Sequence, residues 1–176
     1  AAAIKRSPEG KLVAHTAYPD RVIERLEPVS IKKLGEGHYM VDFGVEISGW
    51  VRFNEVEGPA GHKVEIHPIA NNYSGDNTYI FKGEGAESYA PRFNWFVFHG
   101  VEITNWPGEL KTEDLIAEAV NTFIEPSATF ETSNELFNEI NKIWRRSQTD
   151  NMHGGLASDC PHRERSGYTG DGQIAC

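Results

Sequence analysis

The chain has 176 residues, of which 39% are hydrophobic and 11% aromatic, and its formal net charge is −9. This length and composition support one sizeable domain with a packed core, or one domain together with part of another. The negative charge disfavours nucleic acid and anionic membranes as main partners, because both require a basic face. No apolar run reaches about eighteen residues, so we expect no membrane-spanning helix.

The cysteines argue against a disulfide framework and against a zinc site. The chain has two of them, Cys160 and Cys176, and both lie close to its C-terminal end. With no C-x-x-C pair and no histidine at a ligand spacing, the pattern favours two free thiols over a single bridge. The cysteine pattern thus predicts no zinc site, and we expect no other metal and no cofactor.

The first 131 residues have the pattern of a β protein. Residues 1–21 are polar and interrupted by proline and glycine, which predicts an extended lead-in. From Val22 onward apolar residues alternate with polar ones, and turn residues follow at intervals of roughly 8–12 residues. We therefore expect an antiparallel, jelly-roll-like β-sandwich over residues 22–131. Its expected strands include Val29–Ile31, His38–Phe43, Ile47–Val56, Val64–His67, Tyr79–Lys82, Ser88–Tyr89, Phe93–Phe98, Val101–Thr104, Ile116–Phe123 and Ala128–Glu131.

The pattern changes to that of a helix at Thr132. Thr132 and Glu135 have the spacing of a capping box, and the periodicity predicts a helix from Ser133 to about Asn151. Its apolar residues fall on one face: Leu136, Phe137, Ile140, Ile143 and Trp144. Residues 132–176 therefore begin a second, helical domain. We expect the apolar face to pack on the sandwich, on a second copy of the chain, or on further sequence of a longer protein.

The densest cluster of reactive side chains lies in residues 159–171. Glycine and proline interrupt it, so it is not one regular helix. Three carboxylates, Asp159, Glu164 and Asp171, alternate with Arg163 and Arg165, and an aromatic residue, Tyr168, follows. Each carboxylate alone also suits a solvated loop, and Asp171 suits the first turn of a helix. Together the groups fit a sugar site, since hydroxyls need acceptors and donors and the apolar face of a sugar needs a ring.

Residues 159–173 closely resemble the signature of bacterial α-L-rhamnosidases, glycoside hydrolase family 78, which reads Asp-Cys-Pro-x-Arg-Glu-Arg-x-Gly-Trp/Tyr-x-Gly-Asp-x-Gln. Residues 41–51 resemble a strand of the same family, although Val45-Glu46 stands where Gln-Asn is usual. Gly58-Pro59-Ala60-Gly61, Pro91-Arg92-Phe93 and Val101-Glu102-Ile103 resemble later landmarks of its β-domain. The resemblance extends from about residue 24 to residue 176.

The resemblance implies a β-sandwich packed against an (α/α)6 barrel, of which residues 132–176 are the N-terminal part, and inverting hydrolysis of terminal α-L-rhamnosides. It makes Glu164 the general acid that protonates the leaving oxygen. Asp159 and Asp171 would bind rhamnose hydroxyls, Arg163 would support them, and Tyr168 would pack on the sugar. His162 would have at most a supporting role.

The family's general base is a glutamate late in the barrel, and nothing in these residues corresponds to it. We therefore expect a fragment that is inactive alone. The substrate of the longer parent protein would be a rhamnose-containing glycoside or polysaccharide. We also expect that the fragment can self-associate through the apolar face of its helix. An alternative is a non-catalytic sandwich that binds rhamnose-containing glycans through Trp50, Trp95 and Trp106, although alternating strand aromatics more often fill a core. A third is a sandwich that only stabilises the barrel.

Overall fold

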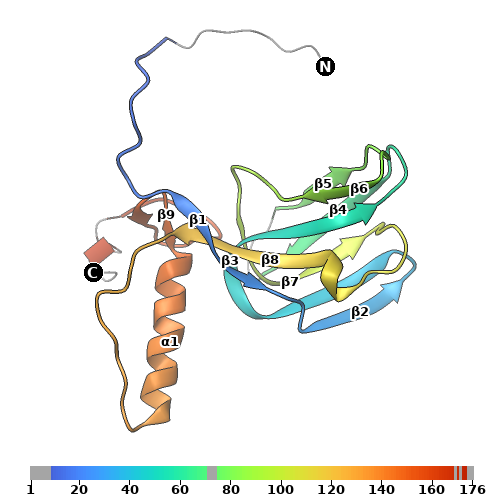
Figure 1. Ribbon diagram of the computed structural model, residues 1–176. Coiled ribbons are helices and arrows are strands. Elements are labelled where there is room, and N and C mark those ends of the chain that lie inside the picture. Colours follow the sequence, from blue (N-terminus) through green and yellow to red (C-terminus); the bar gives the residue numbers. More distant parts are fainter. Residues whose placement is uncertain (1–8, 71–74, 169, 171, 174–176) are drawn as a thin grey trace.

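The computed structural model describes residues 9–70, 75–168, 170 and 172–173, and it is mainly β (Figure 1). A curled antiparallel sheet is followed by one long helix, which confirms the predicted fold class. Its elements in chain order are β1 (Asp20–Leu26), β2 (Ser30–Gly35), β3 (His38–Glu57), β4 (Lys63–Ile69), β5 (Asn77–Ile80), β6 (Ala86–Tyr89), β7 (Phe96–Thr104), the 3₁₀ turn η1 (Thr112–Asp114), β8 (Leu115–Thr122), α1 (Glu135–Asp150), β9 (Met152–His153) and β10 (Leu156–Ala157).

The long strand β3 organises the sheet. The main order is β1-β8-β3-β7-β4-β5, and β2 and β6 also pair with β3. The sequence pattern predicted two strands here, but the chain continues through an irregular stretch where the register with β7 shifts between Asp42 and Ile47. Gly44 lies there with φ +78, a conformation that glycine adopts without strain. The first half of β3 therefore pairs with β2 and the second half with β8 and β6, which curls the sheet around its core.

Alternating apolar residues of these strands fill the core, as the period of two predicts. Phe53 of β3 lies at its centre, with ring centroids 4.9 Å from Tyr79 and 5.8 Å from Trp106. Trp106 is 3% exposed, so its predicted place in the core is confirmed. At Gly49 a Cβ atom would come within 1.9 Å of the Glu118 carbonyl oxygen, so only glycine lets β3 and β8 approach this closely.

The two strands predicted at Phe93–Phe98 and Val101–Thr104 are one strand, β7, and two further local predictions are wrong. Ala128–Glu131 is irregular and not a strand, since no neighbouring strand offers it a partner and Phe130 is exposed. The helix is capped by Asn134 and not by Thr132: the Asn134 side chain accepts a hydrogen bond from the Leu136 N–H at 3.1 Å. The side chain of Asn138 instead holds Thr132, accepting from its N–H and donating to its carbonyl.

Helix α1 lies beside the sheet, next to the ends of β1 and β8 (Figure 1). Its C-terminal half is attached to the sheet by polar contacts. Asp150 accepts a hydrogen bond from the Ser48 N–H at 3.1 Å, and Arg146 pairs with Glu24 of β1 at 2.7 Å. Burial raises the pKa of Asp150 to about 6.

The apolar face of α1 does not pack on the sandwich. Of the three coverings that the sequence analysis allowed, packing on the sandwich is therefore wrong. Its residues are 46–65% exposed: Leu136, Phe137, Ile140, Ile143 and Trp144. The contacts of α1 with the sheet lie at its C-terminal end, at Arg146 and Asp150, so most of this face has no strand against it. Coverage by a second copy or by further polypeptide stays a prediction. In the part of the chain that the structure describes, no helix is long and apolar enough to cross a membrane.

Candidate active site

A closed loop after α1 carries the reactive cluster. Strands β9 and β10 form a small hairpin through Gly154 and Gly155, whose φ values are +64 and +82. A β-bridge between Ser158 and Gly167 then closes the loop at its base. Inside the loop, the Asp159 N–H donates to the Ser166 carbonyl at 3.2 Å. This closure brings residues from both sides of the loop together without any help from a regular helix.

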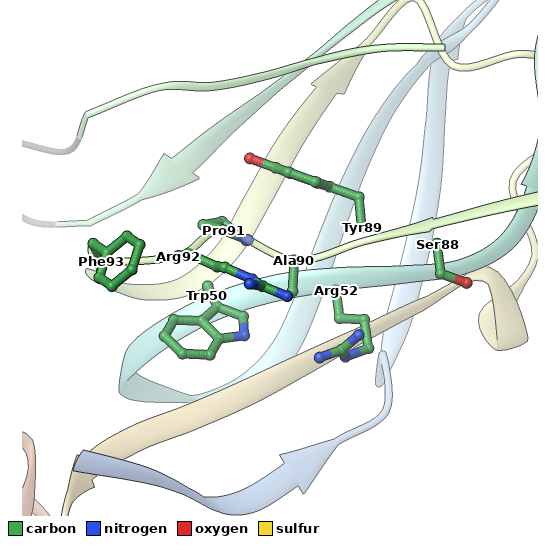
Figure 2. A pocket seen from close by; sticks show the side chains of 8 residues that line it. All are labelled: Trp50, Arg52, Ser88, Tyr89, Ala90, Pro91, Arg92 and Phe93. Carbon is green, nitrogen blue, oxygen red and sulfur yellow. The ribbon is translucent and has the colours of Figure 1, made fainter. Parts of the chain in front are cut away.

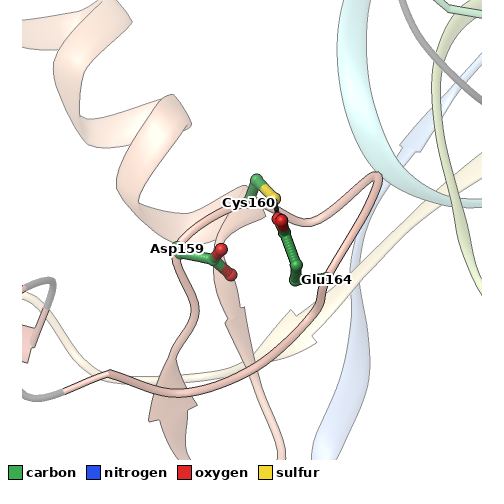
Figure 3. Close-up of side chains that lie close together, drawn as sticks. All are labelled: Asp159, Cys160 and Glu164. Atoms are coloured by element: carbon green, nitrogen blue, oxygen red, sulfur yellow. Dashed lines mark hydrogen bonds between the residues drawn. The ribbon is translucent and has the colours of Figure 1, made fainter.

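Glu164 is the hydrogen-bonding centre of the loop, and Figure 3 shows its carboxyl next to the Cys160 thiol. Its Oε1 accepts from an Nη of Arg163 at 2.7 Å, and its Oε2 accepts from the Cys160 thiol at 2.8 Å. Ligand-type atoms of Asp159, Cys160 and Glu164 all lie within 4.8 Å of one another. Three of the predicted site residues, Asp159, Arg163 and Glu164, are therefore brought together.

These contacts determine the charge of Glu164. The Arg163 guanidinium, followed by the Cys160 thiol, lowers the pKa of the Glu164 carboxyl to about 2. The same hydrogen bond raises the pKa of the Cys160 thiol above its usual value. At neutral pH the carboxyl in this structure is therefore an anion that accepts hydrogen bonds, and not a proton donor.

Asp159 is oriented differently from Glu164. It is partly buried, and its Oδ1 is shielded from water without a hydrogen-bond partner among the described residues. A buried acceptor of this kind is costly unless a donor reaches it. A ligand hydroxyl would supply that donor. Arg163 and the Cys160 thiol each donate to one oxygen of Glu164, so a ligand that reaches this carboxylate must share its oxygens with them.

The remaining predicted residues are less constrained. Tyr168 follows the bridge at Gly167 and is 53% exposed, so its ring is available to a ligand. Asp171 lies outside the described residues, as does Cys176. Cys160 is a free thiol, as the sequence pattern predicted, and it also donates a hydrogen bond to Glu164, which the sequence analysis missed. Its position four residues before Glu164 was the only sequence signal, and that spacing produces a contact only because the loop is closed.

The sandwich carries a separate groove (Figure 2). It has a volume of about 780 Å³, and Figure 2 shows Trp50 and Arg52 from β3 facing the segment 88–93. Phe93 of this segment is fully exposed, with φ +63. Of the three tryptophans considered for a sugar platform, Trp50 alone lines the groove. Trp106 is in the core, and Trp95 stacks on His153 with ring centroids 4.0 Å apart.

Two family models match successive parts of the chain. The bacterial alpha-L-rhamnosidase concanavalin-like domain matches residues 32–72 and 68–121. The bacterial alpha-L-rhamnosidase 6 hairpin glycosidase domain matches residues 125–176, which include α1 and the closed loop. The first model thus covers most of the sheet, without β1, and the second covers the helix and the candidate site.

Known proteins and structures agree with these matches. An alpha-L-rhamnosidase of Formosa agariphila is 31% identical over 97% of this chain and 20% of its own length. The structure of an alpha-L-rhamnosidase from Dictyoglumus thermophilum superposes with a TM-score of 0.85 at 31% identity, over 97% of this chain and 21% of that one. The structure of a Streptomyces avermitilis alpha-L-rhamnosidase complexed with L-rhamnose superposes with a TM-score of 0.76 at 30% identity. The match covers 90% of this chain and 17% of that one. The chain thus spans about a fifth of the length of its curated relatives.

Proposed function

The chain belongs to the bacterial α-L-rhamnosidase family, and we propose that it is the sandwich domain and the beginning of the catalytic domain of an enzyme that releases terminal α-L-rhamnose. The closed loop is the observation that carries the proposal: it holds Asp159, Arg163 and Glu164 together within the residues matched by the glycosidase-domain model. The division into a lead-in of residues 1–21, a sandwich of 22–131 and a catalytic part of 132–176 belongs to the same proposal.

In the proposed mechanism Glu164 is the general acid. It gives its proton to the glycosidic oxygen as the bond to the sugar breaks, so it must be protonated when the substrate is bound. In this structure Arg163 keeps it ionised. We infer that bound rhamnose takes over the hydrogen bonds of Arg163, and that burial of the loop under the sugar and the rest of the barrel raises the pKa of Glu164.

The other site residues hold the sugar in this mechanism. The unpartnered Oδ1 of Asp159 accepts a rhamnose hydroxyl, and Asp171 accepts another. Tyr168 offers its exposed ring to the apolar face of the sugar, where the methyl group of rhamnose lies. Arg163 then donates to hydroxyl oxygens next to Glu164. Each role matches a protein group to one part of the sugar. The carboxylates accept from its hydroxyls, and the tyrosine ring gives a flat apolar surface for its apolar face.

Hydrolysis with inversion also requires a general base, roughly 6.5–9.5 Å from the acid, that activates a water on the opposite face of the sugar. We propose that this carboxylate lies in polypeptide beyond these 176 residues, as the length of the relatives suggests. The 176-residue chain should then give no detectable turnover of an aryl α-L-rhamnoside, whereas the full-length polypeptide should hydrolyse it.

Proton NMR of the first-formed sugar tests the stereochemistry in the same experiment. The full-length protein should release β-L-rhamnose first, followed by mutarotation. Initial release of the α-anomer would contradict inversion. Turnover by the 176-residue chain would contradict the placement of the base, and an inactive full-length protein would contradict the hydrolase itself.

The groove supports a second candidate function, a sandwich that binds rhamnose-containing glycans without cleaving them. Its exposed Phe93 and its half-buried Trp50 offer ring faces, and Arg52 and Arg92 offer donors. Calorimetric titration of the 176-residue chain with rhamnose oligosaccharides tests this. Saturable binding that Phe93→Ala abolishes, and that the matched exposed variant Phe130→Ala retains, would favour it. No binding, or equal binding by both variants, would contradict it.

A further inference from the structure

The two arginines of the closed loop have different environments. Arg163 pairs with Glu164, whereas the guanidinium of Arg165 lies against the sandwich. Its Nη1 donates to Oδ1 of Asn94 at 3.0 Å, and its Nη2 donates to the Trp95 carbonyl at 2.9 Å. It also lies over the Trp95 ring, 4.7 Å from the centroid. Seventy residues of sequence separate these partners, so the contact joins the glycosidase-domain segment to the sandwich.

Trp95 is itself held in place from a second direction. Its ring stacks on His153 of β9 with an interplanar angle of 15°. His153 is fixed by two hydrogen bonds, from Nε2 to the Ser48 hydroxyl at 2.7 Å and from Nδ1 to Asp20 at 3.3 Å. Burial lowers the pKa of His153, which favours the neutral imidazole at neutral pH. Since a carboxylate only accepts, Nδ1 carries the proton and Nε2 accepts from Ser48.

The backbone of Arg165 shows that its contacts act on the loop. Its φ is +55, a left-handed conformation that is strained for a residue with a side chain and persists only where the surroundings enforce it. The N–H of Arg165 also donates to the Cys160 carbonyl at 3.2 Å. Because Glu164 is the preceding residue, any relaxation of this φ would rotate the peptide that carries Glu164 and move its carboxyl.

We propose that Arg165 is a positioning residue: by clamping the closed loop to Asn94 and Trp95, it fixes the site of Glu164 relative to the barrel, and it makes the sandwich part of the catalytic apparatus. The proposal rests on the proposed function of Glu164 as general acid. Both terminal nitrogens of the guanidinium donate, one to each acceptor, and its central carbon lies over the indole. A lysine ammonium reproduces only part of this geometry.

The experiment compares Arg165→Ala and Arg165→Lys with the unmodified full-length enzyme on two substrates. A nitrophenyl rhamnoside needs little acid assistance, whereas an alkyl rhamnoside needs much. Misplacement of the acid should lower kcat on the alkyl substrate about 10²-fold in Arg165→Ala, with a much smaller loss on the nitrophenyl substrate and little change in KM. Arg165→Lys should retain an intermediate rate, and added guanidinium should partly restore Arg165→Ala.

Two controls separate positioning from folding and from the identity of the acid. Arg21→Ala removes an exposed arginine of β1 and should leave both rates unchanged. In a Glu164→Gln background, Arg165→Ala should cause almost no further loss, because both changes remove the same proton transfer. Equal losses on both substrates, or additive losses in the double variant, would overturn the positioning role. An active Glu164→Gln enzyme would instead overturn the acid assignment, a result that is visible independently of Arg165.

Discussion

Glu164→Gln in the full-length enzyme is expected to lower kcat on an alkyl α-L-rhamnoside by about three orders of magnitude. Glutamine has nearly the same shape and keeps an oxygen that accepts from Arg163, so the loop should stay closed. What it lacks is a transferable proton, and a positioned proton donor contributes roughly 10²–10⁴-fold. Initial rates measured with alkyl and nitrophenyl rhamnosides check this, since the loss should shrink as the leaving group becomes more acidic.

Glu113→Gln is the matched control for this variant. Glu113 is an exposed glutamate of η1, in the sandwich, and its replacement removes the same charge without touching the loop. Its rates should stay within about twofold of the unmodified enzyme, as expected for an exposed position. A Glu164→Gln enzyme with similar rates would show that another group protonates the leaving oxygen.

The pH dependence of kcat/KM gives a further check, with a definite sign. With a pKa of about 2, roughly one Glu164 carboxyl in 10⁴ is protonated at pH 6, which is too few for an efficient acid. If the barrel buries the loop and raises this pKa, activity should fall as pH rises through the raised value, because the acid form is lost. Glu164→Gln should remove this limb of the profile.

Much of the sheet was predictable because it follows from local chemistry. Alternating apolar residues set the strands, and glycine and proline set the turns between them. The continuity of β3 through Gly44 was not predictable, since glycine in a strand marks a turn or a bulge equally well. Only pairing with β7 on one side and β2 on the other decides it. The capping residue was missed for a similar reason: Thr132 and Asn134 are both good caps, and the contact between Asn138 and Thr132 selects Asn134.

The candidate site divides in the same way. The proximity of Asp159 and Glu164 was predictable, because only five residues of sequence separate them and glycine and proline lie around them. The family motif supplied their expected roles. The low pKa of Glu164, about 2, was not predictable, because it depends on the two donors that the folded loop places on its oxygens. Nor was the contact of Arg165 with Trp95, since it joins segments that no local pattern relates.

The second large effect is expected on stability, from Glu118→Gln. Glu118 of β8 is fully buried and accepts three hydrogen bonds at 2.7–3.1 Å, from Trp50, Arg52 and Arg25. Glutamine offers one accepting oxygen in place of two and no charge. Removing one member of a buried ionic cluster costs roughly 3–5 kcal/mol. The side chains of Arg25 and Arg52 are 63% and 35% exposed, so water compensates part of the loss, and we expect about 2 kcal/mol.

Urea unfolding of the 176-residue chain at several pH values measures the loss in the free energy of unfolding that Glu118→Gln causes. Burial by itself raises the pKa of Glu118, but the hydrogen bonds from Arg52, Trp50 and Arg25 outweigh it and hold the pKa below the usual value of 4.5. A lowered pKa means that the stabilisation is present above pH 4.5 and is lost as pH falls through the folded-state value. The difference between the two proteins should therefore be largest at neutral pH and shrink in acid.

Glu102→Gln is the control, because it removes a partly exposed glutamate that pairs with His38 on the same sheet. It should change the free energy of unfolding by less than about 0.5 kcal/mol. If Glu118→Gln costs no more than this, the buried carboxylate is dispensable for stability. Its three donors come from β1 and β3, so its role would then be to fix the register of those strands against β8, on which the position of Asp20 beside His153 depends.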